Sequence, residues 1–327
     1  MARSPLKEND RVPNRSMVVL AAIAALLYSG GAALPVHAAT FFTGTLSDAA
    51  NFALLYTANG NNQLSLNNGT VTGNIGIGDP SGTTTGFLAS SGPETINGNV
   101  MYAGAVSGNQ SISNTTLNGT VSGGHTNVQA DITNLYNLSA LVGAETGTTL
   151  TVNLTGSGQS QTVNASSGTL DANGYRVFSV SSFALNNNDT LTINGTANDL
   201  VVLNIPFNVQ INGSLALSGG ITSDQVLINV TGGSNFTGGH TLQMSTNGAA
   251  DYATLMDMNG TITINHTTID GRVFGGDSSN FQFVSGANIT APSTRAPEPG
   301  SVMLMLSGIL GLGAYRLGPG RRSRTAN

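Results

Sequence analysis

Residues 97–118 read NGNVMYAGAVSGNQSISNTTLN, and an Asn-Gly dipeptide stands at each end of the stretch, at Asn97-Gly98 and Asn118-Gly119. The two dipeptides are 21 residues apart. An interval of about 20 residues is typical of one coil of a β-solenoid, in which short strands alternate with corners. The stretch therefore predicts stacked coils with Asn and Gly at the corners and apolar side chains inside.

Blocks of alternating apolar and polar residues lie on either side of this stretch, and alternation predicts half-buried strands. Clear examples are residues 150–154, 190–194, 226–230 and 261–265. Asn-Gly recurs between the blocks, and the interval from Asn194 to Asn212 is 18 residues, close to the length of a second coil. Other intervals are longer. We therefore expect an all-β fold, an irregular solenoid, with a β-sandwich as the alternative because it also has short, regularly spaced strands.

One segment breaks the strand pattern. From Thr126 to Gly143 apolar residues recur at helical spacing, which predicts one long amphipathic α-helix. Thr126 with Gln129 has the sequence signature of a capping box, and Gly143 is placed to end the helix. A single helix needs a surface to cover, so we expect it to pack along the side of the solenoid. We interpret His125 as a cap and Asp131 as part of a solvated face.

Charge and composition exclude several classes of function. Between residues 39 and 296, three arginines stand against thirteen Asp and Glu, a net charge of about −10, whereas the whole chain has −5. Such a surface repels phosphate backbones, which argues against nucleic-acid binding. The chain has no cysteine, and it contains no hydrolase, metalloprotease or P-loop motif. We therefore expect no enzyme activity, no cofactor and no metal site.

Both ends of the chain have the pattern of targeting segments. Residues 1–38 have a basic start, an apolar signal helix and a small-residue cleavage site at Ala38, as in a secretory signal peptide. Near the other end, an uncharged apolar run from Ser301 to Tyr315 predicts a short transmembrane helix of about 23 Å. The arginines that follow would stop transfer on the cytoplasmic side. They are Arg316, Arg321, Arg322 and Arg324. The domains are thus a signal peptide (1–38), a passenger (39–293) and a tail (294–327).

The tail resembles the PEP-CTERM sorting signal, because Pro297, Glu298 and Pro299 precede the apolar run and the arginines in the order that this signal has. The resemblance implies that an exosortase of the inner membrane recognises and cuts the tail. It implies a transient anchor in the membrane through the C-terminal helix, followed by release or attachment outside the cell. The location would be the cell surface or the extracellular space, beside exopolysaccharide.

The passenger is similar to the ice-binding-like adhesive β-solenoid family and to the choice-of-anchor A passengers. The similarity rests on residues 46–55, 73–78, 129–136, 199–205 and 270–274. It also rests on the order of elements, which is opening strands, one helix and then a long series of short strands. The resemblance implies a discontinuous right-handed β-solenoid with the helix along it. Some members of the family bind ice through flat faces rich in Thr, and many are adhesins or matrix components.

Thr-x-Thr pairs indicate where such a face would lie. The pairs are Thr149 and Thr151, Thr190 and Thr192, and Thr261 and Thr263. Thr also suits any exposed strand position, so plain strand propensity is the favoured explanation of these pairs. The sequence therefore predicts a structural or adhesive protein whose partner is an extracellular polysaccharide or a cell surface. Ice binding through a Thr-rich face is the alternative, and a polysaccharide-processing enzyme is the third hypothesis.

Overall fold

The computed structural model describes residues 41–42, 46–58, 63–79, 86–106, 108, 110–231, 240–246, 250–276 and 281–292. Contacts divide the chain into residues 1–37 and 38–327, and every described residue belongs to the second unit. The signal peptide with Ala38 and the tail with Pro297, Glu298 and Pro299 lie outside the described residues, as do the four arginines after the apolar run. The described part contains no helix long and apolar enough to cross a membrane.

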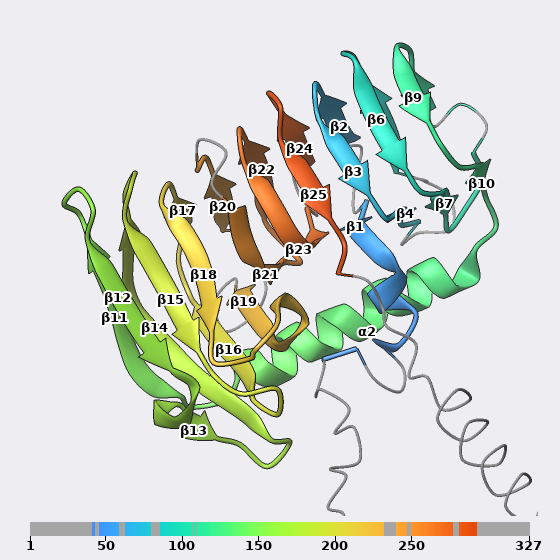
Figure 1. Ribbon diagram of the computed structural model, residues 1–327. Coiled ribbons are helices and arrows are strands. Elements are labelled where there is room, and N and C mark those ends of the chain that lie inside the picture. Colours follow the sequence, from blue (N-terminus) through green and yellow to red (C-terminus); the bar gives the residue numbers. More distant parts are fainter. Residues whose placement is uncertain are drawn as a thin grey trace, which may run out of the picture. The chain divides into compact units, whose positions relative to one another are not determined.

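The described strands are arranged as a stack of coils with three columns of paired strands (Figure 1). We name these the helix-side column, the second column and the third column. The helix-side column consists, in order of pairing, of β11 (Thr148–Leu154), β14 (Tyr175–Leu185), β16 (Leu200–Ile205), β19 (Val226–Val230), β21 (Ala250–Asp257), β23 (Thr268–Gly275), β1 (Phe52–Tyr56), β4 (Asn74–Ile77), β7 (Val100–Tyr102) and β10 (Val121–Ser122).

The second column continues from the C-terminal halves of β11 and β14 through β17 (Val209–Ile211), β20 (Thr241–Met244), β22 (Thr261–Asn265), β24 (Phe281–Val284), β2 (Gln63–Asn67), β5 (Phe87–Ser90) and β8 (Gln110–Ile112). The third column contains β12 (Ser160–Asn164), β15 (Thr190–Asn194) and β18 (Ser214–Ser218), then the first residues of β21 and β23, and then β25 (Asn288–Thr290), β3 (Thr70–Thr72), β6 (Glu94–Asn97) and β9 (Thr115–Leu117). The remaining elements are β13 (Thr169–Leu170), the helix α2 (Thr126–Gly143) and the 3-10 turns η2 (Ala49–Asn51), η3 (Ala165–Ser167) and η4 (Ser223–Gln225).

Almost all of these pairings are parallel, and the exception among the described strands is β13 with β14. A β-sandwich is built from antiparallel sheets, so the pairing excludes that alternative. The coil predicted between Asn97 and Asn118 is confirmed, because Asn118 Nδ2 donates a hydrogen bond to Asn97 Oδ1 (2.8 Å) one coil below. The 18-residue interval is not a coil: Asn194 pairs with Ser218, whereas Asn212 follows a strand of the second column. Coil length varies because the corners differ in length.

The order of coils in the stack differs from their order in the sequence. β1 pairs with β23 on one side and β4 on the other, so that Leu54 lies opposite both Val273 and Ile75. In the same way β2 lies between β24 and β5, and β3 lies between β25 and β6. The N-terminal coils thus continue the stack beyond the C-terminal coil. After β10 the chain must return along the whole stack to begin β11 at the opposite end.

α2 makes this return along the outer surface of the helix-side column (Figure 1). Its 18 residues cover about 27 Å at 1.5 Å per residue. The helix contributes the buried side chains Val128, Ile132, Leu135, Leu138 and Val142. They pack in one cluster with outward-facing residues of the strands, including Leu55, Val202, Leu227, Met256 and Phe274. The predicted helix and its bounds are therefore confirmed, and it covers the side of the solenoid as expected.

The start of α2 differs from the prediction. His125 is the N-cap residue, but no side chain caps the helix, so the predicted capping box of Thr126 and Gln129 is wrong. Gln129 instead accepts a hydrogen bond from the backbone N–H of Asp79 (2.9 Å). Asp131 is 3% exposed, which contradicts its assignment to a solvated face. Burial, together with the charge of Asp48, raises the pKa of Asp131 to about 6.

Two asparagines of the helix-side column bind the last turn of α2. Asn204 Nδ2 donates to the carbonyl oxygen of Val142 (2.6 Å), and Asn229 Nδ2 donates to that of Ser139 (3.1 Å). Ser139 Oγ also donates to Asn229 Oδ1 (2.7 Å). The carbonyl oxygen of Val142 also accepts a hydrogen bond from the backbone N–H of Glu145 (3.2 Å), so these amides add to the backbone hydrogen bonds that end the helix. They fix the C-terminal end of α2 on β16 and β19.

Two kinds of corner connect the columns. Between the second and third columns, a non-glycine residue with positive φ recurs in five coils, at Asn68 (57°), Asn114 (63°), Asn188 (66°), His266 (48°) and Ser285 (57°). At the Asn97-Gly98 and Asn118-Gly119 corners the need for glycine is different. A Cβ on Gly119 would lie 2.1 Å from the carbonyl oxygen of Gly98, so glycine permits the close approach of successive coils.

One arginine joins the segments that meet where β1 pairs with β23. Arg272 is fully buried and forms an ion pair with Asp224 of η4. Its Nη2 donates to the carbonyl oxygens of Ala50 (2.7 Å) and Pro292 (3.3 Å). Its guanidinium lies 4.8 Å from the centre of the Phe42 ring. This side chain therefore connects the beginning of the described fold, the segment after its last strand and a corner of the intervening coils.

We predict that Arg272→Met destabilises the protein by about 3–5 kcal/mol, because it removes one partner of a buried ion pair together with hydrogen bonds to two carbonyls. The matched control is Arg176→Met. Arg176 lies 3.6 Å from Asp199 in a partly exposed pair, and its loss should cost at most about 1 kcal/mol. Urea unfolding of both variants measures the difference, and equal losses would contradict the role assigned to Arg272.

Two inward-facing carboxyl groups of the third column make stability depend on pH. Glu94 (2% exposed) accepts a hydrogen bond from the backbone N–H of Gly69 (3.1 Å), and Asp251 (1% exposed) accepts one from that of Leu215 (2.7 Å). Burial raises the pKa of each group to about 7. The folded protein therefore binds more protons than the unfolded chain between the ordinary pKa, near 4, and about 7.

We predict that the free energy of unfolding falls as the pH rises through this window, because the folded state has to ionise buried acids. Asp251→Asn keeps the acceptor oxygen for Leu215 and removes one titration, while those of Glu94 and Asp131 remain. Urea unfolding at about pH 5 and about pH 8 should show a smaller pH effect in the variant than in the parent. An unchanged pH effect in Asp251→Asn would contradict this role of the carboxyl group.

Candidate functional site

The outward side of the third column carries two regular rows of side chains. Row one consists of Ala250, Thr268, Asn288, Thr70, Thr95 and Thr116, which pair in that order. Row two lies two residues further along the same strands and consists of Tyr252, Asp270, Thr290, Thr72 and Asn97. Neighbouring strands are about 4.8 Å apart and alternate residues about 6.7 Å apart. The two rows therefore form a repeating grid of short polar groups.

The same pattern occurs on the three-stranded sheet of this column. Its outward positions are Ser160, Thr190 and Ser214, then Thr162, Thr192 and Ala216, and then Asn164, Asn194 and Ser218. The two parts of the column meet at β18 and β21, where the backbone N–H of Leu215 binds the side chain of Asp251 in place of a backbone carbonyl. Small hydroxyl and amide groups thus repeat on both sides of this break.

The two rows differ in their hydrogen bonds. In row two, Asn97 Nδ2 donates to Thr72 Oγ1 (3.5 Å), and Asn118 continues the ladder by donating to Asn97 (2.8 Å). In row one, no side-chain hydrogen bond connects Thr70 or Thr95 to another described residue. The row-one hydroxyls are therefore available to an external ligand, while the amide ladder fixes the neighbouring row.

The structure distributes the six predicted threonines over different surfaces. Thr190 and Thr192 lie on β15 and belong to the grid of the third column. Thr261 and Thr263 lie on β22 in the second column. Thr149 and Thr151 lie on the terminal strand β11. The structure therefore does not bring the three pairs together on one surface.

Sequence reasoning missed the longest part of the grid. Thr70 and Thr72 form a Thr-x-Thr pair of their own, and this signal was present. Thr95 and Thr116 stand as single outward threonines, so no local pattern marks them. Their alignment with Thr70 follows from the register of β3, β6 and β9. The lengths of the corners set this register, which cannot be deduced from the Thr-x-Thr pattern.

The outward row of the second column is less uniform. It consists of Gln210, Gln243, Thr263, Gln282, Ser65, Ala89 and Ser111. The glutamines are longer than threonine and lose more rotamer freedom when a ligand orders them. This surface is therefore a poorer template for a repeating ligand than the third column.

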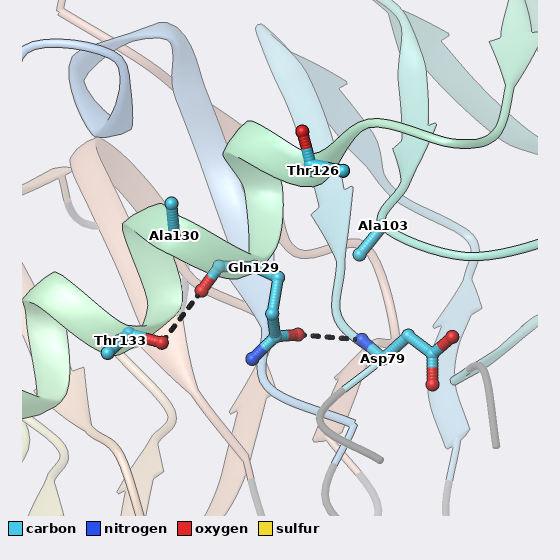
Figure 2. A pocket seen from close by; sticks show the side chains of 6 residues that line it. All are labelled: Asp79, Ala103, Thr126, Gln129, Ala130 and Thr133. Atoms are coloured by element: carbon cyan, nitrogen blue, oxygen red, sulfur yellow. Dashed lines mark hydrogen bonds between the residues drawn. The ribbon is translucent and has the colours of Figure 1, made fainter. Parts of the chain in front are cut away.

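A shallow hollow beside the start of α2 shows no arrangement for chemistry (Figure 2). The residues that line it are Asp79, Ala103, Thr126, Gln129, Ala130 and Thr133. The side chain of Gln129 is engaged by the backbone of Asp79, and the Thr133 hydroxyl donates to the Gln129 carbonyl within the helix (3.0 Å). Nor do the described residues bring together three or more His, Asp or Glu in a group that could hold a metal ion.

Comparisons with known proteins find no matching family model and no matching curated protein. Several solved structures are similar. An ice-binding protein from the Antarctic ascomycete Antarctomyces psychrotrophicus has 13% identity and a TM-score of 0.47, covering 75% of this chain and 97% of its own. An ice-binding protein from an Arctic yeast has 13% identity and a TM-score of 0.49, covering 80% and 98%. The ice-binding protein 1 domain of Shewanella frigidimarina has 12% identity and a TM-score of 0.43, covering 77% and 99%. Scores below 0.5 at such identities do not bear on what this chain binds.

Proposed function

We propose that this chain is an exported protein that binds ice through the grid of the third column. The observation that carries the proposal is row one, in which Thr70, Thr95 and Thr116 repeat at the spacing of paired strands. Thr268 follows in the same row beyond Asn288. A repeating array of short hydroxyl groups can hold many water molecules in fixed positions at once. Such an array matches a crystalline surface better than it matches a single small molecule.

The rigidity of the grid supports the same function. β-Branched threonine has few side-chain rotamers, so little freedom is lost when its hydroxyl binds ordered water. The amide ladder through Asn97 and Asn118 holds the edge of the grid in place. Binding of this kind needs no deep pocket and no bound ion, in keeping with the shallow hollows lined by described residues.

Export and sorting belong to the proposal through the sequence at the two ends. The signal peptide ending at Ala38 would direct the chain across the inner membrane, and an exosortase would act on the tail at Pro297, Glu298 and Pro299. The passenger would then be at the cell surface or free in the extracellular space. There it could meet ice or the surrounding polysaccharide.

Adhesion to a glycan is the second candidate function, and one observation favours it. Tyr252 and Asp270 are neighbours in row two, where they interrupt the small polar groups. An aromatic ring beside a carboxylate suits a sugar, since the ring can cover an apolar sugar face while the carboxylate accepts hydrogen bonds from hydroxyls. This pair would give a local glycan contact within a structural or adhesive matrix protein.

We predict that Thr95→Tyr abolishes inhibition of ice recrystallisation, because a bulky ring between Thr70 and Thr116 in row one prevents a flat surface from approaching these neighbours. The matched control is Thr263→Tyr, which makes the same change at an outward, half-exposed position of the second column. Circular dichroism should show that both variants fold. Retained inhibition in Thr95→Tyr with loss in Thr263→Tyr would assign the activity to the other surface, and no inhibition by the parent protein would refute ice binding.

We predict that Tyr252→Ala leaves recrystallisation inhibition within about twofold of the parent, because Tyr252 lies at the end of its row. If the second candidate function holds, the same variant loses retention on exopolysaccharide. Affinity electrophoresis in a gel that contains the polysaccharide measures this retention. Equal mobility of the parent and the variant in this gel would argue against a glycan contact at Tyr252.

A further inference from the structure

The two ends of the stack differ from its middle in charge. At one end lie β8, β9 and β10, and at the opposite end lie β11 and β12 (Figure 1). Residues 95–130 contain no Asp, Glu, Lys or Arg, and neither do residues 146–170. These two segments supply the terminal strands at both ends. A chain with a net charge of −5 therefore presents two uncharged ends.

Each column ends in a strand that has a partner on one side only. Among the described strands, β8 pairs only with β5, β9 only with β6, and β10 only with β7. At the opposite end, β12 pairs only with β15, and β11 pairs only with β14. Proteins usually protect such edges with charged side chains, proline or a covering element. The terminal strands here contain neither charged residues nor proline.

The end formed by β8, β9 and β10 also exposes part of the core. Val106, Ile112, Leu117 and Val121 pack against the main hydrophobic cluster but are only partly buried. In the next coil inward, Ile96 and Val100 are the register partners of Leu117 and Val121, and both are fully buried. A further coil placed on this end would bury all four side chains.

We propose that copies of this chain associate head to tail, so that β8, β9 and β10 of one copy pair with β11 and β12 of the next. All strands within a column run in the same direction. Head-to-tail stacking therefore extends each column by the same parallel pairing that holds successive coils together. The absence of charge at both ends avoids the repulsion that the acidic sides would cause. The two surfaces lie at opposite ends of the stack, so each contact extends the columns along the same axis and produces linear filaments instead of rings.

At the end formed by β11 and β12, one hydrogen bond limits which backbone groups can pair with the next copy. Gln161 Nε2 donates to the backbone carbonyl of Thr151 (3.0 Å), so that this carbonyl already has a partner within its own chain. The remaining edge groups of β11 and β12 are left for the next copy. Gln161 itself is half-buried at this end. A charge at this position would therefore lie in the contact.

Sedimentation velocity of the full chain over a wide range of concentration tests the proposal. The weight-average mass should rise continuously with concentration, and more steeply at high salt, which screens the repulsion between the acidic sides. A parent protein that remains monomeric throughout would overturn the proposal.

Variants blocked at one end identify the contact. Ile112→Lys and Gln161→Lys each place a charge in one end, and each variant alone should remain monomeric. An equimolar mixture should double in mass to a dimer, because each variant supplies the end that the other lacks. The uncharged controls Ile112→Val and Gln161→Met should associate as the parent does. Leu117→Lys replaces Ile112→Lys if circular dichroism shows that the latter does not fold.

Three results would overturn the head-to-tail contact. If Gln161→Lys dimerises alone, the contact is head to head through β8, β9 and β10. If the mixture stays monomeric, the two ends do not bind each other. If both lysine variants associate as strongly as the parent, the association comes from another segment, such as the apolar run in the tail.

Discussion

The structure depends on the parallel pairing of β1 with β23, which joins the beginning of the described fold to its end. This pairing places the N-terminal coils beyond the last C-terminal coil, and every other feature of the topology follows from it. The chain leaves β10 at one end of the stack and must start again at the other. A helix is the economical connection, because it satisfies its own backbone hydrogen bonds while it crosses the sides of many strands. Because α2 covers it, the middle of the outer surface of the helix-side column is apolar, with Leu55, Met256 and Phe274 under the helix.

Buried polar groups stabilise the junction of β1 with β23 and the C-terminal end of α2. Arg272 holds the segments around Ala50 and Pro292 together, and phenylalanine rings cover the same region, with Phe42 edge-on to Phe274 at 5.8 Å between ring centres. Asn204 and Asn229 bind the last turn of α2. The chain has no cysteine, so these contacts take the place of covalent closure. None of these contacts involves the outward side of the third column, so the side chains there can form a regular polar grid.

Much of this fold could be predicted from local patterns. The alternation in residues 190–194 and 261–265 identified real strands, and the helical period of residues 126–143 gave the helix with its bounds. The 21-residue interval from Asn97 to Asn118 identified a real coil. These features depend on neighbours in sequence. The right-handed sense of the coils stays a prediction, and it rests on the strong general preference of parallel crossovers.

Other features could not be predicted because they depend on residues far apart in sequence. Nothing local indicates that Leu54 pairs with Val273, or that Asn204 binds the last turn of α2. The capping-box signature at Thr126 failed because Gln129 turns to the backbone of Asp79. The candidate surface was only partly found for the same reason. A Thr-x-Thr pair indicates that two threonines are exposed on one strand. A flat array also requires that several strands be in register, and the irregular corners determine this register.

The order of coils can be tested with a pair of introduced cysteines, since the chain has none of its own. Thr70 on β3 and Asn288 on β25 are register partners on the outward side. Partners on paired strands lie within the Cα separation of about 4.4–6.8 Å that a disulfide spans. The account predicts that Thr70→Cys with Asn288→Cys forms an intramolecular disulfide under mild oxidation in the folded protein. Thr70→Cys with Thr116→Cys, which are two strands apart, should stay reduced. Failure of the first pair to cross-link, or equal cross-linking of the second, would contradict the pairing of the N-terminal coils with the C-terminal coil.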